Sequence, residues 1–349
     1  MTTKTVRIDF SKPLECQLSE AAETINRGGL VAFPTETVYG LGASALDKTA
    51  AKKIYAAKGR PSDNPLIIHI AEPEDAEKYC FVNDFYRKIA DNFMPGPITV
   101  IIPKKDIIPK EVTGGLDTVA VRCPRDRVAH TLIKLAGVPI AAPSANISGR
   151  PSPTEAGTVI KEMTGRIDMI IDGGESDIGL ESTIVKADGD GVKLLRPGGI
   201  TLEMLAKVCG HVAVDKAVTE KLSDGEKPEA PGMKYRHYAP QASMHLICGE
   251  GDDFYARATE FLCERLAESE DIGVLCPDEI AERLTGKYIV RLGRSADTEE
   301  HARRLFSALR SFDDMPVKTI YAVSDGEEGI GLAIYNRMLK AAGYSVINI

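Results

Sequence analysis

The stretch Lys58-Gly59-Arg60-Pro61-Ser62-Asp63-Asn64-Pro65 joins a helical pattern to an apolar strand pattern. Lys58 and Arg60 stand two residues apart in it, and the glycine and prolines restrict the path of the loop. A compact ammonium and a planar guanidinium fork are the groups with which proteins usually bind phosphoryl oxygens. The stretch therefore indicates a phosphate site, and the alternative is a solvated turn after a helix.

The residues before this loop follow an amphipathic helical pattern. Asp47 is suited to cap a helix, and Ala50, Ile54 and Ala57 fall on one stripe of it. The predicted helix leads directly into the loop at Lys58.

Two predicted strands carry polar side chains. His69 lies on a strand predicted over 65–70, where it is either a site residue or a packed core histidine with a backbone partner. In the strand predicted over 118–122, alternation places Thr118 and Arg122 on the same face. A hydroxyl group and a guanidinium group therefore share a surface.

Two loops rich in hydroxyl groups follow other apolar runs. The run 29–33 leads into PTETVYGLG (34–42), and the run 139–142 leads into PSANISGRPSPT (143–154). Small hydroxyls and backbone amides ahead of a helix favour an anion, although most loops of this composition are only turns.

The chain of 349 residues is long enough for two domains, and its pattern changes along the sequence. We predict a first α/β domain over 1–208, a polar linker over 209–241 and a smaller α/β domain with a largely parallel sheet over 242–349. The linker segment 233–240 concentrates basic and aromatic residues. This composition favours a flap that covers a binding site, and the alternative is an exposed loop. The turn 249–251 has the spacing of a nucleotide-type turn, but a single GxG is weak support.

Composition narrows the class of protein. No apolar run is long enough to span a bilayer and the first twenty residues hold no apolar stretch, so we expect a cytoplasmic protein. The seven cysteines form no CxxC pair, which argues against a disulfide framework or a structural zinc site. The net charge is −8; residues 1–208 hold 26 Lys and Arg against 27 Asp and Glu, or −1, and the rest hold the remaining −7. This balance disfavours a protein that coats nucleic acid but leaves local basic clusters able to bind an anion.

Taken together, the motifs resemble the YrdC family, in the long two-domain form of the threonylcarbamoyl-AMP synthases. The resemblance covers nearly the whole chain and implies a twisted mixed-sheet YrdC-like domain with a basic groove, then a Rossmann-like α/β domain. It implies the synthesis of L-threonylcarbamoyl-AMP and pyrophosphate from L-threonine, bicarbonate and ATP. A separate transferase would then move the threonylcarbamoyl group to tRNA. The motifs that carry the resemblance are PTETVYGLG (34–42), KGRPSDNPL (58–66), PSANISG (143–149), STIV (182–185), RPG (196–198) and PGMKYRHYAP (231–240).

The resemblance also implies roles for single residues. Those expected around threonine are Thr35, His69, Arg122 and Ser182, with Arg122 the natural partner of its carboxylate. Those expected on the nucleotide are Lys58, Arg60, Asn64, Thr118, Ser144, Asn146, Ser152 and Arg196. From the linker, Tyr235, Arg236 and His237 would cap the site. The expected catalytic residues are Lys58, Arg60 and Arg236. Ala142 stands where some relatives have a hydroxyl group, which puts a threonine contact there in doubt.

Such a reaction brings an anionic carbamate close to the anionic phosphates of ATP. Correct positioning of the substrates and fixed cations would therefore carry most of the catalysis. The resemblance implies Mg²⁺ held mainly by the ATP phosphates, without a metal site made by the protein. One alternative function is an RNA-binding module that uses the basic groove, which the charge distribution disfavours. Another is a carbamoyl-adenylate enzyme of hydrogenase maturation, whose acylphosphatase and zinc-finger segments this sequence lacks. We expect no membrane partner and no direct, stable binding of nucleic acid.

Overall fold

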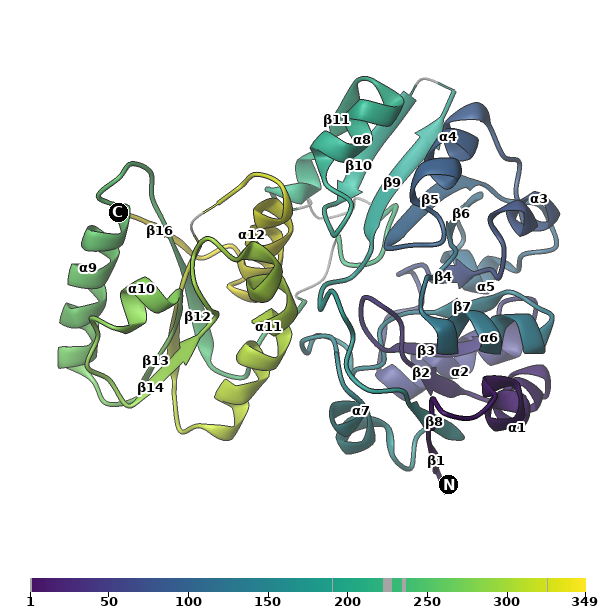
Figure 1. Ribbon diagram of the computed structural model, residues 1–349, viewed down its shortest axis with the longest axis horizontal. Coiled ribbons are helices and arrows are strands. Elements are labelled where there is room, and N and C mark those ends of the chain that lie inside the picture. Colours follow the sequence, from purple (N-terminus) through teal and green to yellow (C-terminus); the bar gives the residue numbers. More distant parts are fainter. Residues whose placement is uncertain (1, 190, 222–227, 234–236, 325) are drawn as a thin grey trace. The chain divides into compact units, whose positions relative to one another are not determined.

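The structure is a computed structural model that describes residues 2–349 except 190, 222–227, 234–236 and 325. The chain divides into two compact units (Figure 1). The first holds the described residues of Met1–Ser148, Ser152–Val218 and Leu222–Lys234. The second holds those of Gly149–Pro151, Thr219–Lys221 and Tyr235–Ile349. The second unit therefore includes two short segments that interrupt the sequence of the first.

Eleven of the described strands form the mixed sheet of the first unit, in the order β1-β8-β2-β3-β7-β4-β6-β5-β9-β10-β11. The sheet contains both parallel neighbours, such as β4 and β6, and antiparallel neighbours, such as β5 and β6, which confirms the predicted mixed sheet. The strands are β1 (Lys4–Arg7), β2 (Val31–Phe33), β3 (Gly40–Ser44), β4 (Ile67–His69), β5 (Ile98–Pro103), β6 (Thr118–Arg122), β7 (Ile140–Ala142), β8 (Met169–Asp172), β9 (Thr183–Asp188), β10 (Gly191–Arg196) and β11 (Val212–Val214).

The helix before the Lys58 loop forms as its sequence predicts. The Asp47 side chain accepts a hydrogen bond from the Thr49 backbone at its start, and Gly59 ends it in the left-handed region. The described helices of this unit are α1 (Leu14–Asn26), α2 (Lys48–Lys58), α3 (Ala76–Tyr79), α4 (Asp84–Phe93), α5 (Lys110–Thr113), α6 (Arg127–Ala136), α7 (Ala156–Met163) and α8 (Leu202–Cys209), with 3₁₀ turns η1 (Pro73–Asp75) and η2 (Lys216–Val218).

One face of this sheet is covered by two separate apolar clusters. Helices α1 and α6 pack on β2, β7 and β8 in the first cluster. Ala217, Ala230 and Met233 pack on β4, β5, β6, β9 and β10 in the second. Ile67 belongs to the second cluster, and His69, two residues later on the same face, touches Phe33 of the first. The polar residues of β4 and β6 therefore lie where the two clusters meet.

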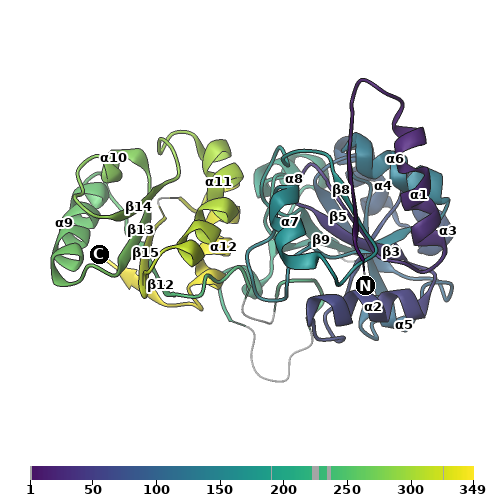
Figure 2. The same cartoon turned by 90° about the horizontal axis from the view of Figure 1, so that it is seen from below.

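The second unit has a parallel sheet in the order β14-β13-β15-β12-β16. Helices α9 and α10 lie on one side of this sheet and α11 and α12 on the other, as Figures 1 and 2 show. This arrangement confirms the Rossmann-like prediction. The elements are β12 (Ser243–Cys248), α9 (Phe254–Glu268), β13 (Ile272–Cys276), α10 (Asp278–Ala281), β14 (Tyr288–Arg291), α11 (Thr298–Ser311), η3 (Phe312–Asp314), β15 (Thr319–Val323), α12 (Ile330–Ala341) and β16 (Val346–Asn348). Among the described helices of both units, none combines the length and apolar character that a membrane span requires.

Two segments differ from the sequence-based predictions. The predicted turn 34–42 runs into strand β3, where a side chain on Gly42 would approach Phe33 and Ile140 to within 2.6 and 2.7 Å, so this strand needs glycine. The linker was predicted to begin at residue 209. Strand β11 pairs with β10 inside the first sheet, so the first unit extends beyond that residue.

Candidate active site

Lys58 ends α2 and connects two of the predicted loops. Its side chain is buried, and its Nζ donates to the backbone oxygens of Ser144 and Asn146, both at 2.5 Å. The Ser148 backbone N–H in turn donates to the Lys58 oxygen at 2.9 Å, and the Ser144 hydroxyl donates to Asn146 Oδ1 at 2.5 Å. The ammonium thereby fixes the 143–148 loop beside the end of α2.

Arg60 shapes its own loop. Its Nε donates to the Asn64 oxygen at 3.4 Å and its Nη2 to the Pro65 oxygen at 3.1 Å. Lys58 and Arg60 therefore contact different sets of backbone oxygens. Their joint contact with a phosphate stays a prediction.

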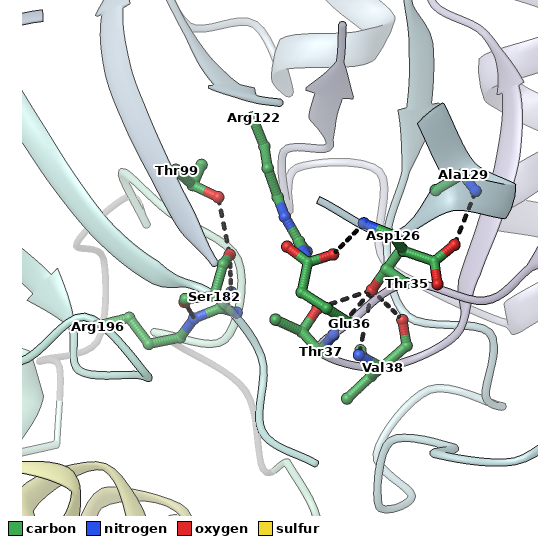
Figure 3. Close-up of polar contacts among 10 residues, drawn as sticks. All are labelled: Thr35, Glu36, Thr37, Val38, Thr99, Arg122, Asp126, Ala129, Ser182 and Arg196. Atoms are coloured by element: carbon green, nitrogen blue, oxygen red, sulfur yellow. Dashed lines mark hydrogen bonds and ion pairs between the residues drawn. The ribbon is translucent and has the colours of Figure 1, made fainter. Parts of the chain in front are cut away.

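An ion pair that the sequence reading did not identify joins the 34–42 segment to β6. Glu36 Oε1 lies 2.9 Å from Arg122 Nη2, and both side chains are almost fully buried (Figure 3). Burial alone raises the pKa of Glu36, but the positive charge of Arg122 is the main effect that outweighs it and leaves the pKa below its ordinary value. Glu36 is therefore a carboxylate. The available signal was an acidic residue inside an otherwise uncharged motif.

His69 lies beside Arg122. The two residues are direct partners in the parallel ladder of β4 and β6, so their side chains share a face. His69 Nδ1 is 3.3 Å from the Ile140 oxygen, and the ring packs edge-on against Phe33. Burial and then the Arg122 charge lower the pKa of His69 to about 3. His69 thus has the backbone partner of a core histidine while it also lies next to the predicted threonine residue.

Acidification should destabilise the protein through His69. Because its folded pKa of about 3 lies below the value of about 6.5 in the unfolded chain, the unfolded state binds more protons between these limits. Stability should fall by up to about 1.4 kcal/mol per pH unit as the pH drops below 6.5. Urea denaturation at pH 7.5 and 5.5 would measure the change in the free energy of unfolding between these pH values. The slope of this free energy with pH should be smaller for His69→Gln, because the variant lacks the imidazole. A His69→Gln slope equal to the parent slope would contradict the assignment.

A second polar cluster lies across from the ion pair. The Ser182 hydroxyl is 2.7 Å from Thr99 Oγ1 and accepts from Arg196 Nη2 at 3.3 Å, while Arg196 Nε donates to the Ser182 oxygen (Figure 3). One residue earlier, Glu181 accepts a hydrogen bond of 2.5 Å from the predicted nucleotide residue Ser152. The structure therefore brings together residues assigned separately to threonine and to the nucleotide.

Thr35 lies beside Glu36, in the turn that carries the ion pair. Its hydroxyl contacts Thr37 Oγ1 at 2.8 Å and donates to the Val38 oxygen at 2.6 Å, so it organises the turn on which Glu36 lies (Figure 3). Thr118 shares the face of Arg122 but is partly exposed, and no side-chain hydrogen bond in the described chain joins it to the other predicted site residues.

Part of the predicted linker lies on the same sheet face. Ala230 and Met233 are buried in the second apolar cluster, and Arg196 Nη1 donates to the Pro231 oxygen at 3.5 Å. Of the three expected flap residues, Tyr235 and Arg236 lie outside the described residues. The His237 ring packs against that of Tyr238, with ring centroids 5.4 Å apart. The predicted role of Tyr235 and Arg236 is therefore open to experiment.

The turn 249–251 of the second unit lines a cavity of about 770 Å³. The described residues around it include Glu250, Asp252, Glu327 and Glu328 and neither lysine nor arginine. Four carboxylates disfavour a phosphate, so the GxG spacing does not mark a phosphate site here.

Comparison with known proteins extends over the whole chain. A family model for Sua5, YciO and YrdC proteins, described as "Telomere recombination", matches residues 23–198. A second model, for the C-terminal domain of threonylcarbamoyl-AMP synthase, matches residues 200–343. The chain belongs to the Sua5/YciO/YrdC family.

Within this family, two relatives match nearly the whole chain. The threonylcarbamoyl-AMP synthase of Pyrococcus abyssi is 46% identical over 340 residues, 96% of each chain. That of Bacillus subtilis is 45% identical over 352 residues, 99% of this chain and 100% of the relative. The crystal structure of P. abyssi Sua5 complexed with L-threonine matches with a TM-score of 0.91 at 45% identity, over 100% of both chains. The predicted family membership is confirmed.

Proposed function

We propose that this chain is a threonylcarbamoyl-AMP synthase that makes L-threonylcarbamoyl-AMP and pyrophosphate from L-threonine, bicarbonate and ATP. The observation that carries the proposal is the full-length likeness to P. abyssi Sua5, which was solved with L-threonine. The buried guanidinium of Arg122 supports it, because a cation beside hydroxyl groups suits the carboxylate of a small amino acid. We expect the reaction in the cytoplasm and a separate tRNA threonylcarbamoyl transferase as the next enzyme.

In this mechanism the site holds two anions and a phosphoryl group in place. The threonine amine and bicarbonate form a carbamate with loss of water; one carbamate oxygen then attacks the α-phosphorus, and the bond to pyrophosphate breaks. Arg122, Thr35, His69 and Ser182 would hold threonine. Lys58 and Arg60 would place the phosphates, with Asn64, Thr118, Ser144, Asn146, Ser152 and Arg196 around the nucleotide. Fixed cations favour the charge that develops on the transferring group.

Mg²⁺ would enter with ATP. No three described His, Cys, Asp or Glu residues come together as a metal-binding group. We propose that substrate oxygens would hold the ion, as is common for Mg²⁺ with nucleotides. When bound, the ion would neutralise phosphate charge.

ATP–pyrophosphate exchange tests the function. The purified chain should exchange labelled pyrophosphate into ATP only when both threonine and bicarbonate are present. Exchange without threonine, or with serine as well as with threonine, would contradict this assignment. RNA binding without such exchange would favour the RNA-binding alternative instead.

Arg236→Ala should slow product formation much more than it changes folding. The side chain is predicted to reach a phosphate or the carbamate from the linker, and removal of one such donor commonly costs about 100-fold in rate. Adenylate yield measures the effect, and the melting temperature of the variant controls for folding. Equal yield from the variant and the parent would remove the flap proposal.

A further inference from the structure

Glu36 carries a buried charge for which the proposed reaction has no step. Its side chain is 2% exposed, and it lies between Thr35 and Thr37. An ionised carboxylate in such a place costs free energy unless it is paired. Its partner is Arg122, so the role of Glu36 depends on what that guanidinium does.

The ion pair leaves one edge of the guanidinium without a protein acceptor. Glu36 Oε1 and Arg122 Nη2 approach to 2.9 Å but are not aligned as a hydrogen bond. Within the described chain, Arg122 Nε and Nη2 are both buried and have no hydrogen-bond acceptor. Nε and Nη2 form the edge that binds a carboxylate through two parallel hydrogen bonds. Glu36 thus balances the charge of Arg122 without accepting an aligned hydrogen bond from Nε or Nη2.

Glu36 is itself held from its other side. Its Oε2 accepts from the Asp126 backbone N–H at 3.4 Å (Figure 3). Its backbone oxygen accepts from the Ile178 N–H at 2.9 Å. These contacts come from two segments distant in the sequence. The carboxylate is therefore a fixed negative charge against which the long Arg122 side chain can be oriented.

We propose that Glu36 is a positioning residue for threonine: it holds the Arg122 guanidinium in the buried site and leaves its Nε–Nη2 edge open to the substrate carboxylate. The inference rests on the proposed function, because it needs an amino-acid carboxylate at Arg122. Without Glu36 the guanidinium is a buried charge without a counter-ion, and it is free to turn toward other acceptors. Glu36 acts through Arg122 and touches no reacting atom.

The test is Glu36→Gln, which keeps the shape and removes the charge. We expect the KM for threonine to rise about tenfold or more, since a lost charged hydrogen bond is worth roughly this factor, while the KM for ATP stays within about twofold. An unchanged KM for ATP would show that the site is still folded. Asp84→Asn is the control: it makes the same change from acid to amide at an exposed position on α4, where Asp84 pairs with Arg87 at 3.3 Å. Its threonine KM should equal that of the parent.

A double variant separates positioning from a direct contact. If Glu36 acts only through Arg122, Glu36→Gln should add no further loss of threonine affinity to Arg122→Gln, as measured by calorimetry with threonine. Glu36→Asp should recover part of the affinity because it restores the charge at a shorter reach. Unchanged or tighter threonine binding by Glu36→Gln overturns the inference alone. A parent protein that binds no threonine overturns the proposed function and this inference together.

Discussion

Arg122→Gln should abolish measurable use of threonine and also destabilise the first unit by about 3–5 kcal/mol. The first effect follows from the loss of the guanidinium predicted to bind the substrate carboxylate. The second follows because Glu36, which pairs with Arg122 at 2.9 Å, becomes a buried charge without a partner. Pyrophosphate release with threonine and urea denaturation would measure the two effects separately.

The double variant Glu36→Gln/Arg122→Gln is the control for stability. Removal of both charges leaves no unpaired ion, so most of the lost stability should return while threonine use does not. A double variant as unstable as Arg122→Gln would show that the ion pair is not the cause. Threonine use by either variant at the parent rate would remove Arg122 from the site.

Lys58→Met should lower adenylate yield by roughly 100-fold or more. Methionine keeps much of the length of the side chain but has no ammonium, so the backbone oxygens of Ser144 and Asn146 lose their donor and the predicted phosphate contact is lost. Single-turnover formation of threonylcarbamoyl-AMP measures the effect.

Lys52→Met provides the comparison on the same helix. Lys52 is exposed and pairs with Glu111 at 3.5 Å, a contact worth little in water, so this variant should keep the parent yield within about twofold. The assignment of Lys58 would be wrong if both variants gave the parent yield.

Local patterns predicted the elements that present the site. The cap at Asp47 and the stripe after it predicted α2, and alternation predicted the strand β6 with Thr118 and Arg122 on the same face. The residue that pairs with Arg122 on the neighbouring strand depends, in contrast, on the order of the strands in the sheet. A local sequence pattern does not predict that order. His69 and Arg122 are 53 positions apart in the sequence and adjacent in the sheet.

The Glu36–Arg122 pair was missed for a similar reason. A single acidic residue in a turn has no periodic signature, and its importance comes from burial against a strand far along the chain. The strand β3 was missed because glycines normally indicate turns, whereas here their small size makes room for Phe33 and Ile140.

The interleaved division of the chain has a consequence for truncation and for the exchange of modules between relatives. Gly149–Pro151 belongs to the second unit, where the Gly149 oxygen accepts from the Ala239 N–H at 3.0 Å and the Pro151 oxygen accepts from Arg310. A single cut near residue 241 therefore cannot release either half with all of its own backbone contacts. A transplanted C-terminal half would need its matching tripeptide from the PSANISGRPSPT loop to keep these backbone contacts.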